Sequence, residues 1–475
     1  MKLSGAQAII KVLLEQGVDT VFGYPGGQVI PLYNALYDAP LRNVLTAHEQ
    51  GAIHAADGYA RASGRTGVCI ATSGPGATNI VTGLATAYLD SVPLVAITGQ
   101  VSVANLGRDS FQEIDIVGVT LPITKYNILV RKPEDLLPAL RQAFYLAQEG
   151  RPGPVLVDVP SNLQVGDVEW MEAEPLTPPV METAREEILE AAAVTITNAR
   201  QPVFLVGGGA VHSGAAEEVL RFARKTGMPV VNTLMGIGVF PGSDRQCLGL
   251  TGMHGHIAAN MAVANADVLI VAGSRFSERV TGDRNRYVGK KTIIQLDIDP
   301  SEVDKNVMTA LPLVGDMKEN LNKLSERVKK LDIEHWWHTI KAWDATENRE
   351  AQSGERLTAP WLMKELTRSF KGEDTVFVTD VGQNQMWAAL HLEVDAPRHH
   401  LTSGGCGTMG FGLPAAMGAK FGAPDRTVCF FTGDGGMQMT IQELGTIMQE
   451  KLNVKIIILN LSLIHISEPT RHAQI

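Results

Sequence analysis

Two acidic residues stand where an apolar stretch, expected to be a strand, gives way to a helical pattern. The first is Asp434, in FTGDGGMQMT, with Gly433 before it and Gly435 and Gly436 after it. Glycines let backbone N–H groups approach an anion closely at the start of a helix. A carboxylate there would repel the anion unless a divalent cation lay between them, so Asp434 is predicted to bind Mg²⁺ beside a phosphate group. For this motif alone, an ordinary glycine turn is the more common explanation.

The second acidic residue is Glu49, in AHEQGAIHAADGYARASG (residues 47–64). We expect it to begin a helix directly after a strand. By itself it is explained as an acid stabilised by the positive end of the helix dipole. The stretch YPGG (24–27) lies in the same part of the chain, and so does another strand-to-helix glycine turn, TSGPGATN (72–79). A purely structural turn is an equally good explanation of the latter.

Length and composition restrict the class of protein. The chain has 475 residues, of which 45% are hydrophobic and 19% are charged. It is therefore long enough for about three folded domains and is not disordered. Its net charge of −10 and its pI near 5.7 argue against nucleic acid or an anionic membrane as the main partner.

The N-terminal stretch is not expected to be a signal peptide, because Lys11 and Glu15 interrupt its apolar residues. Ser4 and Gln7 instead predict a capping box on an amphipathic helix. No apolar run reaches the ~20 residues that a membrane span needs, and a cytoplasmic protein is expected. The cysteines lack a CxxC pair, which predicts free and mostly buried thiols. They are Cys69, Cys247, Cys406 and Cys429.

Apolar runs of strand length alternate with helical patterns, which predicts parallel sheets covered by helices on both faces. The expected fold class is α/β, with three doubly wound parallel-sheet domains of which the third is incomplete. A proline-rich acidic stretch and a charged helical stretch with three tryptophans are expected to connect them. The expected boundaries are 1–165 for the first domain, 166–185 for a linker, 186–330 for the central domain, 331–359 for a connector, 360–460 for the third domain and 461–475 for a separate tail.

The turn at Asp434 is followed, about two dozen residues later, by an apolar strand that ends at Asn460 and is expected to be buried. This arrangement resembles the signature of thiamine diphosphate (ThDP) enzymes, in which GDG is followed at such a spacing by Asn-Asn. In that family the Asp, the second Asn and a side chain or carbonyl two residues further on hold the metal ion. Here Leu461 and Leu463 stand at the last two positions. The chain thus supplies only Asp434 and Asn460, and Asp434 is the metal ligand that the resemblance implies.

The first domain resembles the pyrimidine-binding domain of the same family. One carboxylate of that domain hydrogen-bonds the aminopyrimidine ring and promotes its reactive tautomer, and the resemblance implies this catalytic role for Glu49. Gln100, in ITGQV, is implied to lie near the reacting centre. Phe111 and Gln112, in GRDSFQEID, are implied to face the substrate. A position in the buried core is the alternative for Phe111.

The third domain resembles the domain that binds the diphosphate and the metal. In GCGTMGFG (405–412), the Gly407 carbonyl is implied to accept a hydrogen bond from the 4′-amino group. Met409 is implied to hold the cofactor in its bent shape, whereas a methionine in a glycine loop is otherwise explained as a gap filler. The residues implied to bind ThDP in the two domains are Pro25, Gly26, Gly382, Gln383, Gly407, Met409, Gly433, Gly435 and Gly436.

The central domain resembles the flavin-binding domain of biosynthetic acetolactate synthases. The stretches that carry this resemblance are LVGGGAVHSG (205–214), LTGMHG (250–255), GSRFSERVTG (273–282) and QLDIDP (295–300). The residues implied along FAD are Gly207, Gly208, Gly209, Gly252, Met253, His254, Arg275 and Asp297 or Asp299. Two departures exist: Ser277 and Glu278 replace the usual pair of aspartates, and Ser161 replaces a lysine, which puts that lysine's substrate role in doubt here.

The resemblance as a whole is to the large catalytic subunit of biosynthetic acetolactate synthases. It implies a transferase that decarboxylates pyruvate on ThDP and condenses the two-carbon unit with pyruvate or 2-oxobutyrate. The products lead to valine, leucine and isoleucine, and FAD would be structural because no net redox change occurs. Glu49 and Asp434 are implied to meet across a homodimer or tetramer, with a small regulatory subunit as a further partner.

The last residues do not continue the motif. Residues 461–471, LSLIHISEPTR, resemble a translated adapter from a sequencing library rather than a ThDP enzyme, and a genuine divergent tail is the alternative. We therefore expect residues 461–475 to be non-native and a sheet edge of the third domain to be exposed. The 475-residue chain is expected to bind Mg-ThDP poorly and to be close to inactive.

Other functions remain open from the sequence. A glyoxylate carboligase is disfavoured by the acid at position 49, whereas a sulfoacetaldehyde acetyltransferase is harder to exclude. An oxidoreductase using flavin or nicotinamide could be built on GGGAVHSG (207–214), and it would not need thiamine. A non-catalytic binding module would leave Glu49 unexplained.

Overall fold

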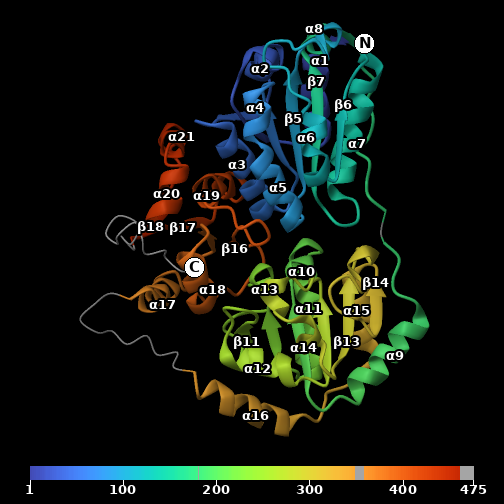
Figure 1. The fold of residues 1–475 in the computed structure, drawn as a ribbon, viewed down its shortest axis with the longest axis vertical. Coiled ribbons are helices and arrows are strands. Elements are labelled where there is room, and N and C mark those ends of the chain that lie inside the picture. The colour runs from blue at the N-terminus through green and yellow to red at the C-terminus, as the bar shows by residue number, and fades with distance from the viewer. Residues whose placement is uncertain (180, 348–357, 461–475) are drawn as a thin grey trace. The chain divides into compact units, whose positions relative to one another are not determined.

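The computed structural model describes residues 1–179, 181–347 and 358–460, and the chain forms two compact units (Figure 1). Of the described residues, one unit contains Met1–Pro178, Glu373–Gln385 and residues 401–460, and the other contains Pro179–Gly372 and Met386–His400. The parallel α/β fold class expected from the sequence is confirmed in both.

The first unit contains a six-stranded sheet in the order β3-β2-β4-β5-β7-β6, and every neighbouring pair in it is parallel. Its strands are β2 (Thr20–Gly23), β3 (Arg42–Leu45), β4 (Gly67–Ala71), β5 (Leu94–Gln100), β6 (Tyr126–Leu129) and β7 (Pro154–Pro160). From β2 the chain passes to β3, at one edge of the sheet, and from β4 it passes through β5 to β6, at the opposite edge. The sheet is therefore doubly wound, and ligands bind such sheets at the carboxyl ends of the strands.

Helices cover both faces of this sheet, because two separate apolar clusters flank it. They are α1 (Gly5–Glu15), α2 (Ile30–Tyr37), α3 (Glu49–Ser63), α4 (Pro75–Asn79), α5 (Val81–Asp90), α6 (Ile116–Thr120), α7 (Leu136–Gln148) and α8 (Ser161–Val165). The expected capping box is confirmed, since the Ser4 and Gln7 side chains each accept a hydrogen bond from the other residue's N–H. The helix expected at Glu49 begins at that residue.

A second sheet of the same unit has the order β16-β15-β17-β18, and β17 is parallel to both β15 and β18. Its strands are β15 (Thr375–Thr379), β16 (His400–Leu401), β17 (Thr427–Gly433) and β18 (Val454–Leu459). The helices are α18 (Gln383–His391), which belongs to the second unit from Met386 on, α19 (Gly412–Gly422), α20 (Asp434–Met439) and α21 (Glu443–Gln449). The expectation of a buried strand before Asn460 is wrong. β18 is an edge strand of the described sheet, and its side chains are half-buried or exposed.

Helices α3 and α19 join the two sheets of this unit by crossing at very short distance (Figure 1). A Cβ placed on Gly58 would lie 2.1 Å from the Ala415 carbonyl oxygen, and one placed on Gly418 would lie 1.8 Å from the Ala55 carbonyl oxygen. The two glycines therefore let the helix backbones touch, and the apolar cluster on this face runs without a break from the first sheet to the second.

The second unit is built on another parallel sheet, in the order β11-β10-β9-β12-β13-β14. Its strands are β9 (Pro202–Val206), β10 (Val230–Asn232), β11 (Cys247–Leu250), β12 (Val268–Ala272), β13 (Thr292–Asp297) and β14 (Leu311–Val314). Its helices are α9 (Glu186–Thr197), α10 (Gly208–His212), α11 (Ala216–Thr226), α12 (Ile257–Asn265), α13 (Glu278–Thr281), α14 (Arg284–Val288), α15 (Met317–Arg327), α16 (Glu334–Asp344) and α17 (Ala359–Ser369). The Trp336 indole N–H donates to the Pro202 carbonyl oxygen at 3.2 Å, so the tryptophan-bearing α16 packs on this unit.

Some local expectations need correction or lie outside the described residues. The stretch expected to be a linker starts with strand β8 (Asp167–Glu169), which pairs antiparallel with β1 (Lys2–Ser4) and buries Val168 against Leu3. The four cysteines are free, as expected, but the expectation that most are buried is only partly right. Cys69 and Cys429 are buried, whereas Cys247 is half-buried and Cys406 is exposed in a glycine loop.

Part of the expected connector (348–357) and the whole expected tail (461–475) are outside the described residues. None of the helices described is long and apolar enough to cross a membrane.

Candidate active site

Glu49 is the first residue of α3 and is almost entirely buried, with 8% of its surface exposed. The Asn79 amide Nδ2 donates a hydrogen bond to Glu49 Oε2 at 2.9 Å. The backbone of Gly76 approaches the other oxygen, since a Cβ placed on Gly76 would lie 3.0 Å from Glu49 Oε1. Turn 72–79 therefore both orients the carboxylate and leaves space beside it.

The YPGG stretch of the first domain (24–27) lies next to turn 72–79. Thr72 Oγ1 accepts a hydrogen bond from the Gln28 N–H at 3.3 Å, and a Cβ on Gly26 would lie 2.4 Å from Thr72 Cγ2. Pro25 precedes Gly26 in this turn. Thr72 thus brings Gly26 and Glu49, which are separated in the sequence, into one neighbourhood.

The surroundings of Glu49 hold polar atoms without partners. Within the described part of the chain, the Tyr33 hydroxyl and the Ser73 hydroxyl are buried and have no hydrogen-bond partner. Burial raises the pKa of Tyr33 and of Cys69, and the negative charge of Glu49 adds to both increases. A polar ligand ring beside Glu49 would suit such a site, and the residues present fit the aminopyrimidine end of ThDP.

A carboxylate of the third domain fixes the chain immediately before Glu49. Glu443, at the start of α21, accepts hydrogen bonds from the backbone N–H groups of Ala47 and His48, both at 3.1 Å. Glu443 is fully buried, and burial raises its pKa. The strand-to-helix junction that presents Glu49 is therefore held by both domains of this unit.

Gln100, at the end of β5, is 3% exposed and uses both ends of its amide within the domain. Its Nε2 donates to Asp158 Oδ2 and to the Ile114 carbonyl oxygen, both at 2.9 Å, and its Oε1 accepts from the Val101 N–H at 2.9 Å. Burial raises the pKa of Asp158 to about 7. In this structure Gln100 anchors the neighbouring loop through Ile114.

The segment expected to face the substrate lies against turn 72–79. Phe111 is 84% exposed, so the alternative of a buried core phenylalanine is wrong. Gln112 has a φ of 59°, and a Cβ placed on Gly74 would lie 2.8 Å from Gln112 Cβ. The loop is closed by Glu113, which accepts hydrogen bonds from the backbone N–H groups of Gly107 and Ser110.

Three glycine turns of the third domain meet around Asp380, which follows β15. Its carboxylate accepts hydrogen bonds from the backbone N–H groups of Val381, Gly410 and Gly412, at 2.7 to 3.1 Å. A Cβ on Gly436 would lie 2.8 Å from Asp380 Cγ. One buried carboxylate therefore sets the spacing between the loop at 405–412 and the turn at 433–436.

The predicted ThDP residues of this domain face each other across that arrangement. Met409 Cε would lie 3.6 Å from a Cβ on Gly435, and Met409 is 39% exposed. Cβ atoms on Gly382 and Gly433 would both lie near Asn384 Nδ2, at 3.5 and 3.8 Å. The set brought together comprises Gly382, Gln383, Gly407, Met409, Gly433, Gly435 and Gly436.

The same edge of the sheet fits a diphosphate and a metal ion. Asn384 Oδ1 is buried and has no hydrogen-bond partner within the described residues, so a donor or a cation would satisfy it. Gly433 on β17 is aligned with Leu459 on β18, which places Asp434 and Asn460 at the carboxyl ends of adjacent strands. Carboxylate and phosphate oxygens are ligands that Mg²⁺ accepts, so Asp434 is the side chain at this edge that fits the metal ion. The described residues contain no group of three His, Cys, Asp or Glu side chains that could hold a metal.

In the second unit, the predicted FAD residues lie at the carboxyl ends of neighbouring strands. The Gly209 N–H donates to the Gly273 carbonyl oxygen at 2.9 Å, and a Cβ on Gly207 would lie 2.4 Å from that oxygen. The Met253 N–H donates to the Arg279 carbonyl oxygen at 2.8 Å, which brings the 252–254 turn to the segment after β12. The remaining residues, Gly208, Gly252, His254, Arg275 and Asp297, belong to these turns and to the end of β13.

Three family models match the chain in the order of its domains. Residues 3–119 match the N-terminal TPP binding domain of thiamine pyrophosphate (TPP, another name of ThDP) enzymes, residues 189–324 match their central domain, and residues 380–463 match their C-terminal TPP binding domain. Glu49 lies in the first match and Asp434 in the third.

Curated relatives resemble the chain over nearly its whole length. The acetolactate synthase large subunit of Corynebacterium glutamicum is 46% identical over 470 residues, which cover 97% of this chain and 75% of that protein. The probable acetolactate synthase large subunit of Methanocaldococcus jannaschii is 47% identical over 472 residues, covering 96% and 80%. The chain belongs to the acetolactate synthase family of thiamine pyrophosphate enzymes. Another member, the isozyme 2 large subunit of Escherichia coli, is 44% identical over 466 residues, covering 96% and 83%.

As a member of this family, the chain is a ThDP-dependent transferase, and its two TPP-binding domains account for ThDP and Mg²⁺ as its cofactors.

Four residues that orient the groups of the site described above were not predicted from the sequence. Asn79 was within a quoted turn, and Asp380 directly follows a strand, where ligand-binding residues collect. Asn384 and Glu443 had no comparable local signal, because their roles depend on contacts with distant segments.

Proposed function

We propose that the chain is the catalytic large subunit of a biosynthetic acetolactate synthase. It decarboxylates pyruvate and joins the two-carbon unit to a second pyruvate or to 2-oxobutyrate, which supplies the synthesis of branched-chain amino acids. The observation that carries this proposal is the 42–47% identity to relatives with this name, across 96–97% of the chain.

In this proposal Glu49 is the proton-handling residue. ThDP, when bound, supplies a ring that accepts the electron pair released by decarboxylation. Glu49 is supported as its partner because Asn79 orients its carboxylate and because unpartnered hydroxyl groups lie around it. From this place it would hold a hydrogen bond to the aminopyrimidine nitrogen and exchange a proton with it.

The remaining site residues take their roles from the two domains that carry them. Pro25 and Gly26 border the pyrimidine, and the glycine turns around Asp380 hold the diphosphate, with Asp434 as the metal ligand. Phe111 and Gln112 contact the substrate, which the exposure of Phe111 supports. Gln100 lies near the reacting centre and anchors the loop that carries them.

FAD is proposed as a structural cofactor of the central domain. The close packing of Gly207 and Gly209 on Gly273, beside Arg275 and Asp297, supports a turn that a dinucleotide can approach. We expect flavin to be released when the purified chain is denatured, and to be recognised by its visible absorbance. Substitution of Gly209 by Leu should abolish flavin retention, whereas the same substitution at Gly445, in α21 of the other unit, should preserve it because a Cβ there meets no atom within 4 Å.

We also propose that the chain is cytoplasmic, that it forms a homodimer or tetramer, and that it binds a small regulatory subunit. The large-subunit names of the relatives support the last point. The proposed organisation is a pyrimidine-binding domain at 1–165, a flavin-type domain at 186–330 and a diphosphate-binding domain at 360–460, with connecting segments between them.

The test compares two proteins with pyruvate as substrate. One is the 475-residue chain, and the other is an extended protein in which residues 461–475 are replaced by the C-terminal segment of the Methanocaldococcus jannaschii relative. We expect the extended protein to form acetolactate only when both ThDP and Mg²⁺ are present. The 475-residue chain should be far slower, because Leu461 stands where the family has an asparagine whose side chain binds the metal, and a leucine side chain cannot replace it.

The matched control is the Glu49→Gln variant of the extended protein, which keeps the shape of the side chain. Loss of the proton-transferring carboxylate should lower the rate by about 10²- to 10⁴-fold. An unchanged rate in this variant would contradict the proposal. So would acetolactate formation without ThDP, or oxidation of a nicotinamide cofactor in its place.

A further inference from the structure

The loop that links β16 to α19 carries two of the residues placed at the cofactor, Gly407 and Met409. Its backbone has few regular hydrogen bonds of its own, because residues 402–410 form neither helix nor strand. Gly407 and Gly410 have φ values of 65° and 84°, in the left-handed region that glycine adopts readily. Other parts of the molecule must therefore hold this loop in one conformation.

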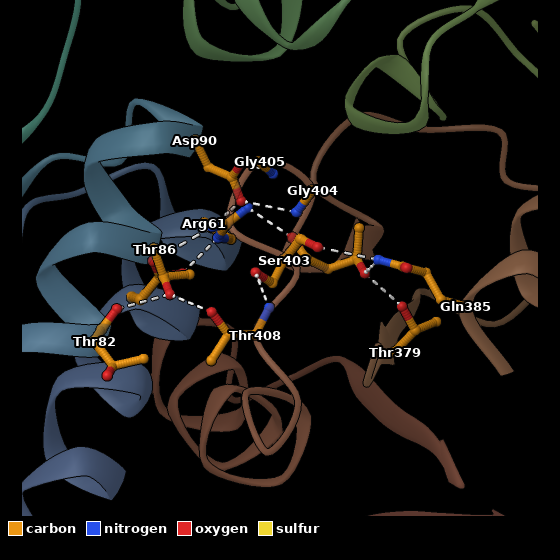
Figure 2. Close-up of polar contacts among 12 residues, drawn as sticks. Arg61, Thr82, Thr86, Asp90, Thr379, Gln385, Ser403, Gly404, Gly405 and Thr408 are labelled. Carbon is orange, nitrogen blue, oxygen red and sulfur yellow. Dashed lines mark hydrogen bonds and ion pairs between the residues drawn. The ribbon is translucent and has the colours of Figure 1, made fainter. Parts of the chain in front are cut away.

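Asp90, the last residue of α5, holds the beginning of the loop from the first domain (Figure 2). Its Oδ1 accepts a hydrogen bond from the Gly405 N–H at 2.7 Å, and its Oδ2 accepts one from the Gly404 N–H at 3.0 Å. A Cβ on Gly405 would lie 2.8 Å from Leu89 Cβ, so the loop backbone lies directly on the end of α5. Both oxygens of one carboxylate thus bind consecutive amides of the loop.

Arg61, on α3, ties this carboxylate to Thr402, the first residue of the loop (Figure 2). Its Nη2 donates to Asp90 Oδ2 at 2.9 Å, and its Nη1 donates to the Thr402 carbonyl oxygen at 2.9 Å. Its Nε donates to Asp57, one helical turn earlier on α3. The side chains of the three charged residues are almost fully buried, with 7% of Arg61 and none of either carboxylate exposed.

Hydroxyl groups hold the second half of the loop. Thr86 on α5 and Thr408 in the loop share a hydrogen bond of 2.7 Å between their hydroxyl oxygens. The Thr408 N–H in turn donates to the Ser403 hydroxyl oxygen at 3.0 Å. The contacts to α3 and α5 therefore bracket Gly407 in the sequence, at residues 402–405 on one side and at Thr408 on the other.

A cluster of this kind is not the simplest way to stabilise a protein. Burying charges costs free energy that their mutual attraction only partly offsets. Asp90 also stands at the carboxyl end of α5, where the helix dipole disfavours a negative charge. The N–H groups of the two loop amides and of Arg61 offset this unfavourable charge by donating hydrogen bonds to Asp90. The hydrogen bonds of the cluster therefore fix where the loop lies.

We propose that Asp90 and Arg61 are positioning residues that set the conformation of loop 402–410 before ThDP binds. They do not touch the reacting atoms. They hold the Gly407 carbonyl and the Met409 side chain where the aminopyrimidine ring of the cofactor is received. This role rests on the proposed function, but the ordering of the loop can be measured independently of it.

The first test is hydrogen exchange on the 475-residue chain, without cofactor. Asp90→Asn keeps the size of the side chain but removes the charge that both loop amides and Arg61 recognise. We expect the amides of Gly404 and Gly405 to exchange at least about tenfold faster than in the parent chain. The matched control is Asp57→Asn, which also breaks an ion pair of Arg61 but removes no hydrogen bond to the loop.

The outcomes of this test separate a positioning role from a structural one. If both variants keep the parent's circular dichroism and only Asp90→Asn deprotects the loop, the proposal is supported. Equal exchange at Gly404 and Gly405 in the two variants would overturn it, because the cluster would then stabilise the helices alone. Asp90→Glu is a second variant that keeps the charge, and it should restore part of the protection.

The second test measures the ThDP concentration that gives half-maximal acetolactate formation by the extended protein. Asp90→Asn should raise this concentration by about tenfold or more, with a smaller effect on the rate at saturating ThDP, because the missing contacts act on cofactor binding. An unchanged ThDP requirement alongside a deprotected loop would overturn the link between the loop and the cofactor. Absence of acetolactate from the parent extended protein would instead count against the proposed function, and hydrogen exchange would still decide the role of Asp90.

Discussion

Asp158 shows how one buried carboxyl group makes stability depend on pH. Burial raises its pKa to about 7, from an ordinary value of 3.8, although Thr98 and Gln100 both donate hydrogen bonds to it. The folded chain therefore keeps this proton to a higher pH than the unfolded chain does. The resulting stabilisation is complete below about pH 4 and is lost as the pH rises to about 7.

We predict that Asp158→Asn gains stability relative to the parent chain when the pH is raised from about 5 to about 8. The expected gain is about 2 to 3 kcal/mol, because the variant has no proton to lose over this range. Denaturant unfolding of both proteins at the two pH values measures it. Thr98→Val is the control, since it changes the same contact but keeps the carboxyl group, and it should still lose stability with rising pH. A difference between parent and Asp158→Asn that does not vary with pH would contradict the assignment.

At the scale of elements, the crossing of α3 and α19 decides how the two ThDP-binding sheets of the first unit are placed. Helix α3 begins with Glu49 and carries Arg61, and α19 directly follows the cofactor loop. Because backbone atoms touch at Gly58 and Gly418, this contact has no flexible side chain that could adapt to a change. The geometry of the site therefore depends on two positions that have no chemical function of their own.

We predict that Gly418→Ala destabilises the chain by about 1 to 3 kcal/mol or more, since the added methyl group overlaps the Ala55 carbonyl oxygen. Thermal or denaturant unfolding measures the change. Gly445→Ala is the matched control, because Gly445 lies within α21 and a Cβ there meets no atom within 4 Å. This control should be neutral or stabilise by up to about 1 kcal/mol. Equal effects of the two substitutions would show that the helices are not closely packed.

At the scale of the whole molecule, the two predicted ends of the ThDP site belong to different domains. The carboxylate of Glu49 is held by Asn79, whereas the turn at Asp434 packs against Met409 and Asp380. The family resemblance implies that the first domain of one chain faces the third domain of another. Each site would then take one residue of this pair from each chain.

A complementation experiment tests this arrangement in the extended protein. Glu49→Gln and Asp434→Asn should each abolish acetolactate formation when expressed alone. When the two are co-expressed in equal amounts, mixed dimers should contain one intact site, and about a quarter of the parent activity should return. No recovery, with mixed dimers present, would mean that each site is formed within a single chain. Tagging the two variants differently allows the mixed dimers to be isolated and assayed.

Local patterns in the sequence were sufficient for the fold class, for the capping box at Ser4 and for the helix that begins at Glu49. Strand, turn and helix signals arise from neighbouring residues, and such signals survive in the folded chain. The same signals were wrong for β18, whose apolar residues are half-buried or exposed at an edge, and for the strand β8 within the expected linker. Burial and strand pairing depend on what lies alongside, which a single segment does not contain.

The chemistry of the site residues could be inferred from residue type and spacing, because an acid after a strand and a glycine turn before a helix are recognisable without a structure. The residues that hold these site residues in place could not be inferred in this way. Asn79 reaches Glu49 across 30 positions, Glu443 reaches His48 across 395, and Asp90 reaches Gly404 across 314. Contacts over such separations follow from the order of the strands and the angle at which α3 and α19 cross. Only the packed tertiary structure determines these, because they result from the simultaneous burial of many side chains.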